Sequence, residues 1–130
     1  MFVRLFVLIL FPALLLAGDI RLRGSLVGSV ESNGDVRIRG SIVGRFESGG
    51  DIRVKGSLAG KIESDGGIRK NGSLVGKVES DGDVRVNGSL RGKVENDGDV
   101  RDNGSIIGSA RGVPKAQAAC LFFFGFFDLK

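Results

Sequence analysis

The chain has 130 residues with 22 Gly, 2 Pro and 1 Cys, and it contains no His, Trp or Tyr. The glycines do not recur at every third residue, which excludes collagen, and a hydrophobic fraction of 42% argues against disorder. The 19 basic and 15 acidic residues leave a net charge of only +4. A domain that binds polyelectrolytes through charge is normally more lopsided, so nucleic acid is not an expected partner.

The first 17 residues read MFVRLFVLILFPALLLA, with one Arg before an apolar run. This pattern is typical of a secretory signal peptide. A retained membrane anchor formed by a hydrophobic helix is the alternative, because about 17 apolar residues is near the lower limit for spanning a bilayer. We therefore expect a secreted or membrane-anchored protein, with cleavage after Ala17 favoured over a retained anchor.

From Gly18 to Val113 one 16-residue unit is written six times, and its positions are numbered 1 to 16 in each copy. Apolar or small residues at odd positions alternate with mostly polar ones, which is the period of a β-strand. One 16-residue unit cannot bury its own apolar face, whereas a stack of identical units buries a continuous one. We therefore predict an all-β fold, a parallel β-solenoid of six coils over residues 18–113. The copies begin at Gly18, Gly34, Gly50, Gly66, Gly82 and Gly98.

Three positions are apolar in every copy and are predicted to form the core. Position 10 should face outwards but is apolar in five copies, and an apolar stripe on a rod is a candidate lateral contact. The predicted core comprises position 3 (Ile20, Val36, Ile52, Ile68, Val84, Val100), position 9 (Leu26, Ile42, Leu58, Leu74, Leu90, Ile106) and position 13 (Val30, Phe46, Ile62, Val78, Val94, Ala110). The predicted lateral contact comprises Val27, Val43, Ala59, Val75 and Ile107.

An antiparallel meander is the main alternative fold. Asn-Gly at 71–72, 87–88 and 103–104, and Asp-Gly at 65–66, 81–82 and 97–98, are signals for β-hairpins. A single-layer meander would leave its apolar face unpaired, so the solenoid is preferred. The Gly at position 11 lies in mid-strand, where Gly usually marks a bend or a close backbone approach.

Charged residues also fall in register. They predict solvated ion-pair stripes, and an anion-binding ladder at position 4 is a second interpretation. Glu at position 14, Asp at position 16 and Asp at position 2 are expected to converge at an acidic corner, to which Glu79 and Asp83 belong. Such a corner would allow weak calcium binding, although no EF-hand pattern is present. The position 4 ladder comprises Arg21, Arg37, Arg53, Arg69, Arg85 and Arg101.

Residues 114–130 carry five Phe in six positions beside the single Cys120. We predict a cap over the open end of the stack, with self-association or membrane contact through an exposed apolar patch as the alternative. Four departures from the repeat lie in the last three copies, which indicates that the stack weakens towards the end that the tail would cover. These departures are Lys70, Arg91, Asp102 and Arg111.

No catalytic, cofactor or metal site is predicted, because there is no His and the Ser at position 8 has no partner to activate it. The motif GDIRVKGSLAGKIE of residues 50–63 resembles the core of bactofilins, polymer-forming bacterial cytoskeletal proteins. The resemblance implies a right-handed parallel β-solenoid that polymerises end to end without nucleotide. We therefore predict a non-enzymatic structural protein that self-assembles by coil stacking. The alternative is an exported monomeric binding module for an anionic or calcium-bearing surface polymer.

Overall fold

The computed structural model describes residues 18–130. The predicted signal peptide or hydrophobic helix of residues 1–17 lies outside the described residues. Within the described part, no helix is both long and apolar enough to cross a membrane.

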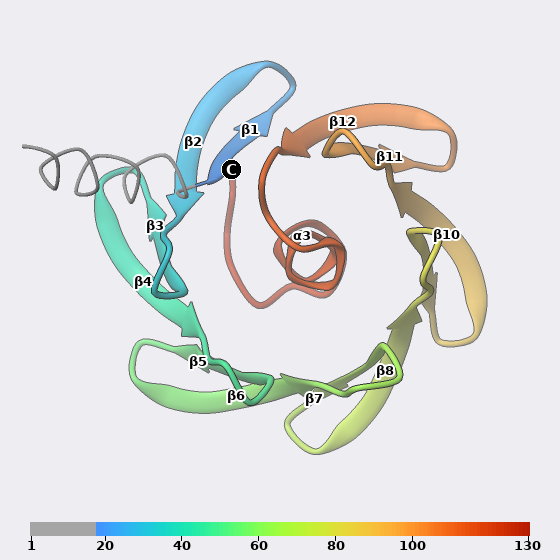
Figure 1. Cartoon of the computed structure of the whole chain (residues 1–130), viewed down its shortest axis with the longest axis horizontal. Coiled ribbons are helices and arrows are strands. Elements are labelled where there is room, and N and C mark those ends of the chain that lie inside the picture. The colour runs from blue at the N-terminus through green and yellow to red at the C-terminus, as the bar shows by residue number, and fades with distance from the viewer. Residues whose placement is uncertain (1–17) are drawn as a thin grey trace, which may run out of the picture.

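Each copy of the repeat folds as one β-hairpin, and the six hairpins supply twelve strands (Figure 1). The first strand of a hairpin begins at position 1 or 2 and ends at position 5, and the second runs from position 8 to position 13. The strands are β1 (Gly18–Leu22), β2 (Ser25–Val30), β3 (Asp35–Ile38), β4 (Ser41–Phe46), β5 (Asp51–Val54), β6 (Ser57–Ile62), β7 (Gly67–Lys70), β8 (Ser73–Val78), β9 (Asp83–Val86), β10 (Ser89–Val94), β11 (Asp99–Asp102) and β12 (Ser105–Ala110).

The predicted parallel β-solenoid is wrong, because every strand pairs antiparallel with its neighbours in sequence and β1 pairs with β12 to close a barrel. The meander is therefore the correct alternative, in a closed form. Closure removes the objection to a single layer, since the apolar face turns inwards and is buried against the tail. It also leaves no unpaired strand edge among residues 18–130, so coils cannot be added end to end.

Two kinds of turn alternate around the barrel and define its two rims. At the two-residue rim, positions 6 and 7 both have positive φ, for example 52° at Asn71 and 86° at Gly72. This is the type I′ geometry that Asn-Gly favours. At the three-residue rim, the Gly at position 1 has positive φ, and Gly34 N–H donates to the carbonyl oxygen of Glu31 at 2.8 Å. Such a turn with a glycine bulge is the usual three-residue hairpin.

A β-bulge in every hairpin inverts the alternation of side chains. Ile52 pairs with Gly60 but Arg53 pairs with Leu58, so the residue at position 10 has no partner of its own. An extra residue moves the following side chains to the other face. The predicted core at position 3 is confirmed with all six side chains 0% exposed, and position 13 also lies inside, buried except for the half-buried Ile62. The prediction for position 9 is wrong, because its side chains are 52% to 58% exposed.

The position 10 residues correspondingly lie on the inner side, half-buried and packed against the core, so the predicted outward lateral stripe does not form. Arg91, which replaces an apolar residue in the fifth copy, is exposed. The half-buried members are Val27, Val43, Ala59, Val75 and Ile107.

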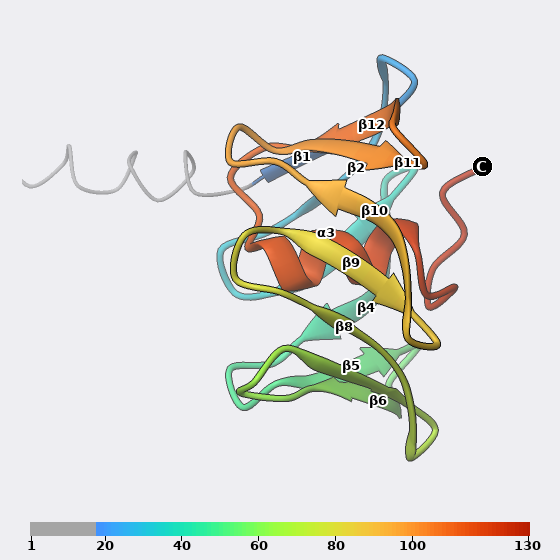
Figure 2. The ribbon, with the colours of Figure 1, turned by 90° about the vertical axis from the view of Figure 1, so that its right-hand side faces the viewer.

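The tail fills the barrel instead of capping a stack. After β12 the chain passes Pro114 and forms α3 (Lys115–Phe122), which lies in the centre of the ring of hairpins in both views (Figures 1 and 2). The helix presents small or narrow buried side chains, Ala118, Ala119 and Cys120, and packs against β8, β10 and β11. Small side chains allow a helix to fit inside a barrel whose walls already carry Val and Ile. Three of the five Phe side chains of the tail are buried and two are half-buried, so the exposed apolar patch that was the alternative for the tail does not form.

Candidate functional site: the filled interior and the outer girdle

The five Phe rings of the tail sit on glycines at position 11 of five successive hairpins. A Cβ built on any of these glycines would lie 2.5 to 2.7 Å from a ring carbon, closer than side chains ever approach. The predicted close approach at position 11 is confirmed, and it has two causes, the ring and a carbonyl oxygen of the neighbouring strand. The pairs are Phe122 with Gly108, Phe123 with Gly92, Phe124 with Gly76, Phe126 with Gly60 and Phe127 with Gly44.

The order of these pairs shows how the tail is arranged. Along the tail the rings contact the sixth, fifth, fourth, third and second copies in turn, so the chain winds back around the inside of the barrel. Each ring occupies space that a side chain at position 11 would otherwise take. The uniform Gly at position 11 therefore serves the tail as well as the sheet.

Two of the residues that depart from the repeat, Lys70 and Arg91, also contact the tail. Lys70 Nζ donates to the carbonyl oxygens of Phe124 at 2.9 Å and Gly125 at 3.2 Å, and lies 5.3 Å from the centre of the Phe126 ring. Arg91 pairs with Asp102 through two hydrogen bonds of 2.7 and 3.1 Å. The prediction that these departures weaken one end of a stack is wrong, because the barrel is closed and has no such end, and Lys70 and Arg91 make polar or cation–π contacts with the tail.

The Arg91 guanidinium also lies 6.0 Å from the centre of the Phe123 ring, a distance at which a cation–π interaction is favourable. The other departure, Arg111, lies outside the interior and pairs with Asp99 at 3.3 Å.

Cys120 is a free cysteine and is fully buried in the core. Desolvation raises the pKa of its thiol to about 12. A thiol that stays protonated at neutral pH is a poor nucleophile, so crosslinking of chains through Cys120 is not supported.

The position 9 residues form an outer girdle, with one aliphatic side chain on each hairpin and each more than half exposed. On every hairpin this side chain lies opposite the Arg at position 4, as Leu58 lies opposite Arg53. The girdle therefore alternates apolar side chains with charged ones around the barrel. It comprises Leu26, Ile42, Leu58, Leu74, Leu90 and Ile106.

The predicted anion ladder is largely neutralised by carboxylates. Five of its six Arg residues pair with the Glu at position 14 of the preceding copy; one example is Arg85 Nε to Glu79 Oε2 at 2.9 Å. The other four pairs are Arg37 with Glu31, Arg53 with Glu47, Arg69 with Glu63 and Arg101 with Glu95. The remaining member, Arg21, donates to the carbonyl oxygen of Gly24. The predicted ion-pair stripes are thus present, running from one hairpin to the next.

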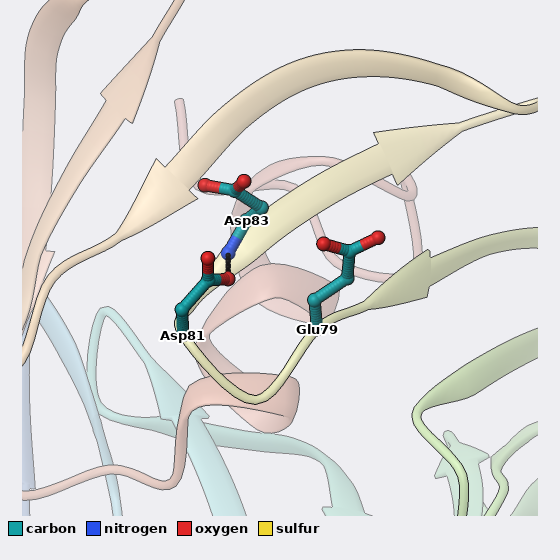
Figure 3. A group of neighbouring side chains, drawn as sticks. All are labelled: Glu79, Asp81 and Asp83. Carbon is teal, nitrogen blue, oxygen red and sulfur yellow. Dashed lines mark hydrogen bonds between the residues drawn. The ribbon is translucent and has the colours of Figure 1, made fainter.

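The acidic corner also forms, at the three-residue rim. Carboxylate oxygens of Glu79, Asp81 and Asp83 lie within 4.8 Å of one another (Figure 3). Asp81 Oδ1 accepts a hydrogen bond from the Asp83 N–H at 3.0 Å, which stabilises the turn. Arg85 holds Glu79, and Lys93 lies 3.9 Å from Asp83, so part of the negative charge is already balanced. The expectation of weak calcium binding at this corner is not tested by the structure, and the two cations argue against it.

A comparison with family models, curated proteins and solved structures found no match. The function must therefore be argued from the chain itself.

The girdle is the candidate surface that the sequence pattern missed. Simple alternation puts positions 3, 9 and 13 on one face, and for this reason it predicts that position 9 belongs to the core. The bulge at position 10 moves position 9 to the outer face. The sequence signal of this bulge is the Gly at position 11, since Gly in mid-strand can mark a bulge.

Proposed function

We propose that the protein is a non-enzymatic structural protein that self-associates side by side through its outer girdle. The observation that carries the proposal is the set of six aliphatic side chains, more than half exposed, at one height on six equivalent hairpins. A single exposed aliphatic side chain is ordinary on a protein surface, but the same one on six successive hairpins gives a regular series of apolar contacts that lateral association would bury. Coil stacking is replaced by lateral contact, because the closed barrel has no free strand edge in the described part.

The energetics favour an assembly of many weak contacts over a tight dimer. Burying a whole Leu side chain yields about 1.5–3 kcal/mol, so the exposed half of each girdle residue contributes about 1 kcal/mol. Two girdle residues from each of two barrels would then supply about 4 kcal/mol, near the lower limit of the cost of association. Contacts with several neighbours at once would make the assembly stable, and six hairpins offer several directions for them.

The carboxylates and cations beside the girdle would limit this association to a defined arrangement. The ion pairs between successive copies flank each girdle residue with both charges, so a neighbouring barrel meets opposite charges on either side of the apolar contact. Charge pairs of this kind contribute to register more than to affinity.

Sedimentation velocity and electron microscopy of the purified chain over a range of concentrations test the proposal. We expect association that increases with concentration and is weakened by the double variant Leu58→Ser/Leu74→Ser. The matched control is Lys61→Ser/Lys77→Ser, which changes two exposed side chains on the same strands, β6 and β8, outside the girdle. A monomer at every concentration, or equal association of both variants, would contradict the proposal.

The predicted export of the protein completes the proposal, since a secreted or membrane-anchored scaffold would assemble outside the cell or at its surface. Mass spectrometry of the mature N-terminus in the native host tests this part. A first residue at Gly18 or Asp19 supports export, and an intact Met1 on a soluble protein contradicts it.

A further inference from the structure

The two-residue rim is charged on one half only. Position 6 is Arg23, Arg39 and Lys55 in the first three copies and Asn in the last three. All six residues have positive φ, between 50° and 52°. Asn tolerates this conformation far better than Arg or Lys, so the first three turns carry their charge at a conformational cost. Strain of this kind is concentrated at functional sites.

The interior behind the rim is also asymmetric. In the later copies the polar side chains Lys70, Arg91 and Asp102 lie beside the tail, and the cavity there, of about 400 Å³, is lined by both members of the Arg91–Asp102 ion pair. In the second and third copies position 5 carries Ile38 and Val54, and a cavity of about 480 Å³ lies beside them. This volume lies within the range of small-molecule binding sites.

Apolar side chains and cations together line this cavity. Its lining includes Val43, Val54 and the rings of Phe126 and Phe127, together with Arg39 and Lys55. Both cations are exposed side chains on adjacent hairpins.

The two cations are available to a ligand. Arg39 donates one N–H to the carbonyl oxygen of Leu129 at 2.9 Å. A guanidinium has five N–H donors, so others remain for a ligand. The Lys55 backbone N–H donates to the carbonyl oxygen of Val43, but its side-chain Nζ has no hydrogen-bond or ion-pair partner among residues 18–130. Asp128 also lines the cavity, but it forms no salt bridge with either cation; its Oδ1 accepts from the Lys130 N–H at 3.0 Å.

We propose that this cavity binds an aliphatic carboxylate, of the class of medium-chain fatty acids. The hydrocarbon chain lies against Val43, Val54 and the two Phe rings, and the carboxylate lies between Arg39 and Lys55. The apolar walls exclude small hydrated anions, because these would lose their water without replacement. The paired cations favour a carboxylate over a neutral lipid, since charge-assisted hydrogen bonds are stronger than neutral ones. The inference does not depend on self-association.

Isothermal titration calorimetry of the full chain with decanoate tests the proposal, with decanol as the uncharged probe. The variants Lys55→Asn and Arg39→Asn introduce the residue that the later copies carry at the same turn position, so they fold without added strain. We expect saturable binding of one decanoate, weakened roughly tenfold in each variant, and much weaker binding of decanol.

Arg23→Asn is the matched control, because Arg23 occupies the same position of the same turn but lines a different cavity. It should leave the affinity for decanoate unchanged. The proposal is overturned by equal binding of decanol, by an affinity that Lys55→Asn and Arg39→Asn do not change, or by equal weakening in Arg23→Asn. Adsorption of decanoate on the outer girdle would give the second of these results.

Discussion

Replacing Gly76 by Ala tests directly how the tail fills the barrel. The added Cβ would lie 2.5 Å from Phe124 Cε1 and 2.7 Å from its Cζ, and it would also collide with the carbonyl oxygen of Arg85. The ring, the neighbouring strand, or both must move. Overpacking of a filled core costs about 1–3 kcal/mol, and two simultaneous collisions put this variant near the upper limit. We expect Gly76→Ala to lower the free energy of unfolding by about 3 kcal/mol.

A double-mutant cycle separates the ring from the strand. Phe124 is only 6% exposed, so Phe124→Ala alone should cost about 3–5 kcal/mol. In the double variant Gly76→Ala/Phe124→Ala the new methyl group meets no ring, and the summed cost should fall by about 1–2 kcal/mol. Gly28 is the matched control: its Cβ would collide with the carbonyl oxygen of Arg37, but its three nearest atoms belong to the neighbouring strand. Its cycle with Phe124→Ala should be additive within about 0.5 kcal/mol.

Urea denaturation followed by circular dichroism measures all of these free energies of unfolding. Gly49→Ala provides the baseline, since its Cβ would meet nothing within 4 Å and its φ is not in the left-handed region. If Phe124→Ala does not fold, Phe124→Leu takes its place in both cycles. This expectation is refuted if the effects of Gly76→Ala and Phe124→Ala are additive and Gly76→Ala costs as much stability as Gly28→Ala. That result would show that the Phe124 ring does not rest on Gly76.

Three further predictions concern the turns, the thiol and the acidic corner. Lys55→Asn should raise the melting temperature and the reverse change Asn71→Lys should lower it, because Asn tolerates positive φ better than Lys does. Each shift should correspond to about 1 kcal/mol in the free energy of unfolding. Melting temperatures equal to that of the wild type would contradict this. The Cys120 thiol stays protonated in the folded chain up to its pKa of about 12, whereas the unfolded chain loses this proton above about 9. The free energy of unfolding should therefore fall as pH rises from about 9 to about 12, by up to about 1.4 kcal/mol per pH unit. Denaturation of the wild type and of Cys120→Ala on both sides of pH 9 measures this difference, and a parallel loss in both would refute it. Calcium at millimolar concentration should leave the melting temperature unchanged, since Arg85 and Lys93 already balance part of the charge of the acidic corner. An equivalent group is formed by Glu95, Asp97 and Asp99. A rise that Asp81→Asn and Asp97→Asn together abolish, and that Asp65→Asn at the incomplete corner beside Gly67 does not, would instead establish calcium binding.

The sequence pattern predicts the strands but not how they pair. Alternation places Ile52 and the other position 3 residues on one face, and this face is buried both in a solenoid and in a barrel. The choice depends on whether a strand pairs within its own copy or with the next copy, and the turn decides it. Asn71-Gly72 suits a two-residue type I′ turn, which returns the chain antiparallel to itself. The turn sequence therefore predicts the correct pairing, whereas the uniform period does not distinguish the two.

The bulge and the closure are less accessible to sequence reasoning. Leu58 and Ala59 are both apolar, so the pattern does not show which of them faces outwards. Closure depends on the twist accumulated over all twelve strands, a property of the whole sheet that no single copy encodes. The fit between tail and barrel was visible only in part, since five Phe and six mid-strand Gly are complementary in size but lie far apart in the sequence.

The departures from the repeat mark the places where an asymmetric tail meets a nearly six-fold wall. A perfect repeat would offer six identical faces to one helix and one loop, and such a wall cannot satisfy polar groups of the tail that occur once. Lys70 binds two tail carbonyl oxygens, Arg91 and Asp102 pair beside Phe123, and Arg39 binds the carbonyl oxygen of Leu129. Among residues 18–130 no buried side-chain polar atom lacks a partner. The copies have therefore diverged at positions 5, 6 and 10, which surround the tail, while the outer girdle at position 9 has remained aliphatic in all six. One asymmetric tail thus explains the variation at the inner positions, whereas the uniform position 9 is the surface that the proposed self-association would use.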